Sequence, residues 1–136
     1  MAEFPPLPPG VLLFPEGLPG FENLTRFVLL QEEDLLPIVF LRSLAEPNIC
    51  LPVTPVRCIR PEYDLRLEDD DRRVLDLADQ AVPESDLMCL VVLKLGDGLQ
   101  PATANLLAPI VVNLRNHVAK QVIQIRSLYS TAVEVS

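Results

Sequence analysis

The sequence of 136 residues contains no tryptophan, only two tyrosines and five phenylalanines, and a single histidine. With so few aromatic side chains, the core has to be built from leucine, valine and isoleucine, which the 49% share of apolar residues supplies. No apolar run approaches the roughly 18 residues that a membrane-spanning helix needs. Residues 1–6 have neither the basic start nor the apolar stretch of a signal peptide. We therefore predict a cytoplasmic protein without a membrane partner.

The sequence also lacks the residue patterns on which most enzymes and metal sites depend. A lone histidine in a polar turn, as His117 is, is more often solvated than catalytic. Cys50, Cys58 and Cys89 show no Cys-x-x-Cys spacing and are predicted to be reduced, buried thiols. No GxGxxG motif, phosphate loop or nucleophile elbow occurs. We predict no catalytic residue, no metal site and no cofactor.

Basic residues are in the minority, with 11 lysines and arginines against 19 acids and a net charge of -8. Nucleic-acid-binding proteins normally carry the opposite sign, so no direct nucleic-acid partner is expected. Residues 62–86 hold ten acids and three arginines, a local balance of -7. Asp69, Asp70 and Asp71 in this segment are either a solvated helix start or a surface that attracts a basic protein. Calcium is disfavoured, because calcium-binding loops alternate their acids and include a turn glycine.

Prolines are numerous, 14 in all, and they are spread along the chain. Each tends to end or kink a helix, so long helices are not expected. A short helix is predicted at residues 68–77. Strands are predicted at residues 11–14, 25–30, 38–43, 49–54, 87–95, 103–113 and 118–128, with a further candidate at 63–67. This pattern predicts an all-β fold, a barrel or sandwich with one or two short helices.

Three of these strands carry detailed expectations. Pro52 predicts an edge or a bulge in its strand, and Pro109 predicts a bulge in the strand at 103–113. Residues 87–95 are apolar on both faces, which is typical of a central strand. In residues 118–128, Ile123 and Ile125 are expected to face the core, and Gln124 and Arg126 to face solvent. The chain divides into a proline-rich arm at 1–10, one domain at 11–130 and a tail at 131–136 that lacks a strong signal.

Two segments carry a resemblance to a known family. Residues 14–22 read Phe-Pro-Glu-Gly-Leu-Pro-Gly-Phe-Glu, followed by Arg-Phe-Val-Leu-Leu at 26–30. Residues 105–113 read Asn-Leu-Leu-Ala-Pro-Ile-Val-Val-Asn, followed by Lys-Gln-Val at 120–122. Between them lie Phe-Leu-Arg-Ser at 40–43 and Pro-Glu-Tyr at 61–63. In this order and spacing, the segments resemble the flagellar assembly factor FliW family over roughly residues 11–129.

The resemblance implies a compact β-barrel-like protein of the bacterial cytoplasm, without catalytic activity or a cofactor. It implies two protein partners: flagellin, bound before export, and the translational regulator CsrA, which is prevented from repressing flagellin mRNA. The two compete, which couples the level of flagellin to its translation. From the residues alone, a small β-barrel that binds an apolar ligand is the alternative.

The N-terminus departs from the family pattern, because a proline arm at 4–9 stands where relatives open with a strand that carries a Phe-Gly pair. A short or absent first strand would leave a sheet edge open, so weak self-association is expected.

The two motifs also supply candidate site residues. In the first motif, Gly17 and Gly20 permit backbone angles that other residues resist, and Pro19 stiffens the turn. The turn presents Leu18 and Phe21, either as a corner packed on the core or as apolar contacts for a partner.

The second motif leaves a similar choice. Ile110 and Val112 are predicted core residues. Asn105 and Asn113 either satisfy backbone groups around the bulge at Pro109 or touch a partner.

Overall fold

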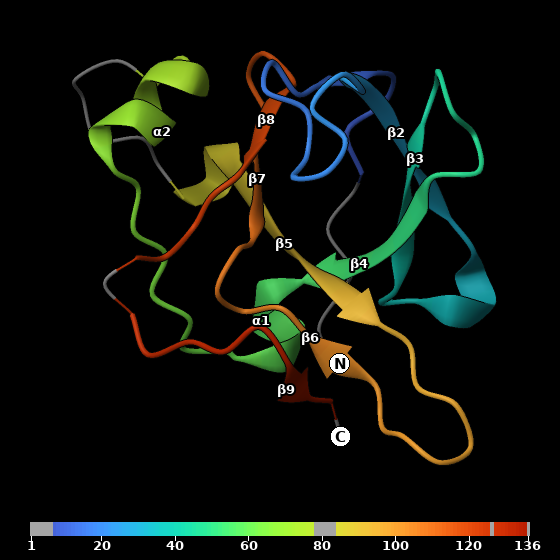
Figure 1. Cartoon of the computed structure of the whole chain (residues 1–136). Coiled ribbons are helices and arrows are strands. Elements are labelled where there is room, and N and C mark those ends of the chain that lie inside the picture. Colours follow the sequence, from blue (N-terminus) through green and yellow to red (C-terminus); the bar gives the residue numbers. More distant parts are fainter. Residues whose placement is uncertain (1–6, 78–83, 126, 136) are drawn as a thin grey trace.

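The computed structural model describes residues 7–77, 84–125 and 127–135. Within these ranges, seven strands close into a barrel in the order β4-β3-β2-β1-β8-β7-β5, and β5 pairs back with β4 (Figure 1). Their bounds are β1 Leu12–Leu13, β2 Arg26–Gln31, β3 Val39–Ser43, β4 Cys50–Pro55, β5 Leu87–Lys94, β7 Ile110–Asn113 and β8 Val118–Gln121. Neighbours are antiparallel except β1 and β8, which are parallel. The predicted all-β barrel is confirmed.

In the described parts of the chain, four short helical segments accompany the barrel: η1 Glu33–Leu35, α1 Val56–Ile59, α2 Asp69–Val74 and η2 Glu84–Asp86. α1 packs on β4 and β5, and α2 packs on β8 (Figure 1). The predicted helix at 68–77 forms as α2 because Glu68 and Asp71 make a capping box, in which each side chain accepts the other residue's backbone N–H. Residues 63–67 are not a strand. Among the described residues, no helix has the length and apolarity to cross a membrane.

β5 is buried on both faces, as its sequence predicts. Met88 and Leu90 point into the barrel, where the rings of Phe14 and Phe27 meet edge to face at 5.0 Å. Val91 belongs to a second apolar cluster, on the outer side of the sheet. Because alternate side chains of a strand point to opposite faces, both faces of β5 need an apolar cover.

The predicted strand at 103–113 is divided in two. β6 Thr103–Ala104 and β7 Ile110–Asn113 pair with successive parts of β5, and the loop at 105–109 separates them. This loop is a wider excursion than the predicted single bulge at Pro109. In β4, Pro52 lies opposite Phe40 of β3, whereas the pairing of β4 with β5 begins only at Val53. Pro52 therefore sits where β4 is paired on one side, which matches the predicted edge.

Described residues near both ends of the chain contact the fold. Leu7 packs against the core and Pro8 is buried, so the proline arm ends against the barrel. The edge expected to be open at the first strand is occupied, because β1 lies between β2 and β8. The tail forms β9 Val133–Glu134, which pairs with β6. A strand of two residues carries too little alternation to be recognised in a sequence.

The predicted orientation of the C-terminal return is wrong. Ile123 and Ile125 are 54% and 66% exposed, whereas Gln124 is 3% exposed. The two isoleucines lie on the same face as Ala119, whose side chain points into the barrel. They are exposed because they follow the end of β8, where the barrel no longer covers this face. Gln124 lies on the opposite face, under residues 64–68. Arg126 is outside the described residues.

The cysteines are free thiols, but they are not all buried as predicted. Cys58 is exposed, and Cys50 and Cys89 are half-buried. Burial raises the pKa of the Cys89 thiol to about 12, so this thiol stays protonated.

The turn at 14–22 is a tight corner that depends on Gly17. Its φ is +65°, and a Cβ there would lie 2.5 Å from the backbone oxygen of Phe21. Gly20 also has a positive φ, +86°, but a Cβ there would meet nothing within 4 Å. Mutual backbone hydrogen bonds join Leu18 and Phe21 across the corner.

We expect Gly17→Ala to lower the free energy of unfolding by about 3 kcal/mol, since it adds a backbone collision to the cost of a positive φ. The matched variant Gly20→Ala carries only the cost of a positive φ, so its free energy of unfolding should fall by about 1 kcal/mol. Urea denaturation of both variants measures the difference. Equal losses would show that the collision at Gly17 is relieved by a small backbone shift.

Candidate functional site

The motif residues predicted as partner contacts lie mostly inside the fold. Leu18 is 2% exposed and Phe21 is half-buried against the core. Asn113 is buried, and its side chain donates to the Leu75 carbonyl at 2.9 Å. The side-chain oxygen of Asn105 accepts the N–H groups that follow it in the 105–109 loop. The positions of these side chains fit the structural interpretation of both motifs.

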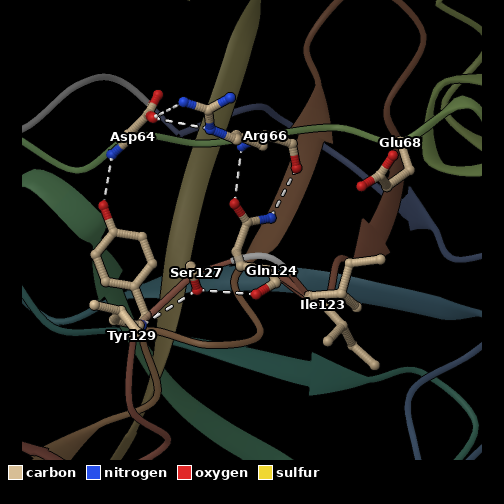
Figure 2. A pocket seen from close by; sticks show the side chains of 9 residues that line it. Asp64, Arg66, Glu68, Ile123, Gln124, Ser127 and Tyr129 are labelled. Atoms are coloured by element: carbon tan, nitrogen blue, oxygen red, sulfur yellow. Dashed lines mark hydrogen bonds and ion pairs between the residues drawn. The ribbon is translucent and has the colours of Figure 1, made fainter.

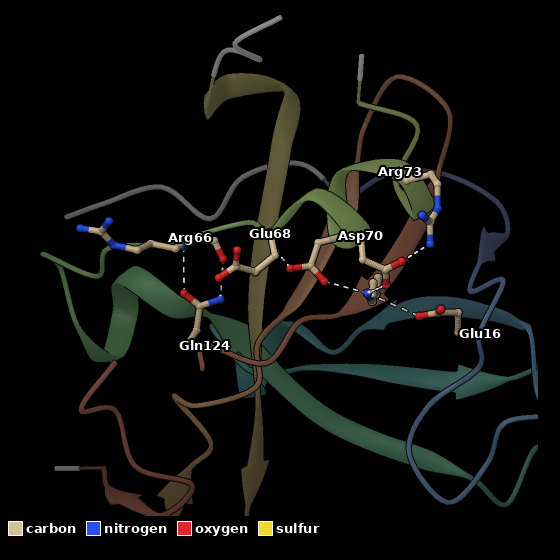
Figure 3. Close-up of polar contacts among 8 residues, drawn as sticks. Glu16, Arg66, Glu68, Asp70, Arg73 and Gln124 are labelled. Atoms are coloured by element: carbon tan, nitrogen blue, oxygen red, sulfur yellow. Dashed lines mark hydrogen bonds and ion pairs between the residues drawn. The ribbon is translucent and has the colours of Figure 1, made fainter. Parts of the chain in front are cut away.

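Lys120 on β8 is the centre of an ion cluster that the sequence did not predict. Its ammonium lies 2.7 Å from Asp71, 3.1 Å from Asp70 and 3.5 Å from Glu16 (Figure 3). The Lys120 side chain is only 13% exposed, and Asp71 is buried instead of solvated. The cluster joins three segments: the corner at 14–22, the helix α2 and the strand β8.

A signal for this cluster was present in the sequence. Residues 98–133 contain no acid, so a lysine there can pair only with acids that are distant along the chain. Of the three consecutive aspartates, Asp71 and Asp70 face Lys120, and Asp69 remains exposed.

The cluster shifts the pKa values of two of its members. The hydrogen bond from Lys120 holds the pKa of Asp70 below its ordinary value of 3.8, and the nearby Arg73 acts in the same direction. Burial alone would lower the pKa of Lys120, but the hydrogen bonds to Asp71 and Asp70 outweigh it and raise the pKa above 10.5. Each shift favours the charged form of the group.

Gln124 binds the segment at 64–68 to the residues that follow β8. Its side-chain oxygen accepts the Arg66 N–H and its amide donates to the Arg66 carbonyl, both at 2.8 Å (Figure 2). The Tyr129 hydroxyl accepts the Asp64 N–H at 2.9 Å, and its ring stacks on Tyr63 at 4.4 Å. Backbone groups of Asp64 and Arg66 are thus paired with side chains instead of a neighbouring strand.

An open groove of about 410 Å³ lies between these two segments (Figure 2). One wall carries Asp64, Arg66 and Glu68. The remaining lining residues are Ile123, Gln124, Ile125, Ser127, Leu128 and Tyr129. The two isoleucines are more than half exposed and Leu128 is fully exposed, so the groove has an apolar strip. Contiguous exposed apolar side chains mark interaction surfaces.

The groove lies on the outer surface, and the barrel interior is filled. Leu12, Phe27, Leu41 and Leu90 inside the barrel have no solvent exposure. In the groove, Arg66 is paired with Asp64 at 2.9 Å. An apolar strip beside charged groups suits the side chains of another protein.

The fold and the site together define a small closed β-barrel with an open apolar groove on its outside. A family model described as FliW protein matches residues 7–135. The chain belongs to the FliW family.

Named relatives agree with this family. The flagellar assembly factor FliW of Pseudothermotoga lettingae is 40% identical over 88% of this chain and 74% of its own length. The Bacillus subtilis protein of the same name is 32% identical over 89% of this chain and 82% of its own length. A crystal structure of the flagellar assembly factor FliW superimposes with a TM-score of 0.82 at 32% identity, over 91% of this chain and 84% of the other. The name describes an assembly factor and not an enzyme.

We expect Lys120→Met to lower the free energy of unfolding by about 3 kcal/mol, because it leaves the buried Asp71 carboxylate without its partner. Arg73→Met is the matched control. It removes an exposed cation that also contacts Asp70 and should lose less than about 1 kcal/mol. Urea denaturation at neutral pH compares the two. A similar loss in both variants would contradict a structural role for the cluster.

The same cluster predicts a dependence on acid pH. Since the pKa of Asp70 is lowered in the folded state, its contribution is present above pH 3.8 and is lost as the pH falls through the folded pKa. Below about pH 4, the melting temperature of the wild type should therefore fall more steeply than that of Lys120→Met. Thermal melts of both proteins between pH 7 and pH 3 measure this. Parallel curves would show that Lys120 is not what lowers the pKa of Asp70.

Proposed function

We propose that this protein is a cytoplasmic flagellar assembly factor that binds flagellin and antagonises the translational regulator CsrA, so that the flagellin level controls flagellin translation. The observation that carries the proposal is the FliW family match over residues 7–135. The apolar strip of Ile123, Ile125 and Leu128 supports it, because a factor that acts by binding proteins needs exposed apolar surface.

The acidic side of the molecule is the proposed approach for CsrA, an RNA-binding protein expected to be basic. The exposed acids there include Glu62, Asp64, Glu68 and Asp69. Asp70 and Asp71 contribute less to an outward field because Lys120 faces both. Like charges along one surface accelerate the approach of a partner of opposite charge. Among the predicted motif residues, Phe21 and Asn105 retain partial exposure and are candidates for a secondary contact.

Calorimetric titration of the protein with flagellin and with CsrA from the same organism tests the function. We expect each partner to bind at micromolar concentration or tighter, and flagellin to displace CsrA. An absence of binding to both partners at such concentrations would contradict the proposal.

Charge reversal separates the two partners. Asp69→Lys should weaken CsrA binding about threefold at low salt and flatten its salt dependence, with flagellin binding unchanged. Asp69 is suitable because it is exposed and has no ion pair with another described residue. Asp71→Lys is unsuitable, because it would break the Lys120 cluster. An unchanged CsrA affinity at low salt would exclude Asp69 from the CsrA surface.

A further inference from the structure

The pairing of β7 with β8 continues beyond the end of β8. The Val122 N–H donates to the Pro109 carbonyl and the Gln124 N–H donates to the Leu107 carbonyl, both at 2.8 Å. These contacts continue the antiparallel register in which β7 pairs with β8, because Ile110 lies opposite Gln121 in that pairing. Residues 122–124 are therefore extended and act as a further stretch of strand.

In an antiparallel pair, the backbone groups of successive residues point alternately toward the partner strand and away from it. Val122 and Gln124 point toward the chain at 107–109, so the N–H and C=O groups of Ile123 and the N–H group of Ile125 point to the other side. Ile125 then begins a turn, in which the Ser127 N–H donates to the Gln124 carbonyl at 3.1 Å. In the part of the chain that the structure describes, none of these three groups forms a hydrogen bond. β1 pairs with that side of β8 only where Leu13 meets Val118. Within the described ranges, the strand edge at Ile123 and Ile125 is therefore open.

This open edge combines two features that most proteins avoid. It has unpaired backbone groups, and its side chains are exposed isoleucines without a charged residue between them. Natural sheets normally cover such an edge or protect it with charge. Gln124, which separates the two isoleucines, does not block the edge because its side chain is held by Arg66 on the opposite face.

Charge favours a basic occupant over a second copy of this chain. Among the described residues, the groove wall beside the edge carries the carboxylates of Asp64 and Glu68 and the guanidinium of Arg66, which is paired with Asp64. The whole chain has a net charge of -8. Two copies that paired through this edge would bring their acidic walls together, which is unfavourable.

We propose that residues 122–125 are a docking edge for an extended, basic segment of another protein. The segment adds a strand beside Ile123 and Ile125, forms backbone hydrogen bonds with both, and places lysine or arginine near Asp64 and Glu68. Its alternate apolar side chains contact the strip that ends at Leu128. The inference rests on the proposed function, because it supplies a surface for one of the protein partners.

Short synthetic peptides test the edge without either protein partner. The probe is a capped, fluorescent peptide of alternating lysine and valine, titrated with the protein at low salt and read by fluorescence anisotropy. One control peptide replaces every lysine with glutamate, and another keeps the sequence but carries N-methyl groups on alternate valines. We expect each control to bind at least tenfold more weakly, because one removes the charge match and the other removes the backbone donors.

A pair of protein variants locates the binding. Ile123→Pro removes one outward N–H and leaves the N–H groups of Val122 and Gln124 in place. It should therefore weaken binding of the lysine-valine peptide at least tenfold. Ile123→Val keeps the N–H and should bind within twofold of wild type. The peptide controls keep the test decisive if Ile123→Pro does not fold.

Three results would overturn the inference. The N-methylated peptide could bind as well as the unmodified one, which indicates contact through side chains alone. The glutamate peptide could bind equally well, which removes the charge argument. Wild-type protein could dimerise in analytical ultracentrifugation while Ile123→Pro stays monomeric, which assigns the edge to a second copy. None of these results affects the titrations with whole flagellin and CsrA, so a failure here is distinguishable from a failure of the proposed function.

Discussion

The ion cluster around Lys120 is the interaction on which the outer layer of this barrel depends. α2 is six residues long, too short to be stable without tertiary contacts. Asp70 and Asp71 tie it to β8, because they meet an ammonium that β8 holds largely away from water. Because Glu16 meets the same ammonium, the corner at 14–22 is also tied to α2. An ion pair with little solvent exposure is sensitive to the loss of either partner, so these three segments are coupled.

The groove follows from the same arrangement. Residues 64–68 lead into α2, and residues 122–129 follow the strand that carries Lys120. Between these two walls, the Gln124 amide occupies the hydrogen-bonding positions that a neighbouring strand would otherwise fill at Arg66. A side chain can satisfy one residue in this way but not a whole edge. On the side of β8 that faces β1, the sheet is closed where Leu13 pairs with Val118, but among the described residues it is open a few residues later at Ile123 and Ile125.

Several elements could be predicted because their determinants are local. The short helix α2 was predicted from the acids in its own first turn, and the burial of β5 on both faces was predicted from its uninterrupted apolar run. The corner at 14–22 needs Gly17, whose positive φ and close backbone contact exclude a side chain. The orientation of Ile123 and Ile125 could not be predicted in the same way. The prediction correctly placed both isoleucines on the face opposite to Gln124. Which of these two faces is covered depends on residues 64–68 and on where the barrel ends.

The sequence by itself therefore determined the class of fold, the tight corner, the short acidic helix and, through its two motifs, the family. Turn chemistry, capping and strand alternation depend on residues that are close together in the chain, which is why they can be predicted from the sequence. Only the tertiary structure decided that Lys120 gathers three distant acids, that Asp71 is buried, and that an apolar strip lies exposed beside an acidic wall. Those features depend on contacts between segments about fifty or more residues apart, such as Gln124 with Arg66, and local patterns carry no information about such contacts.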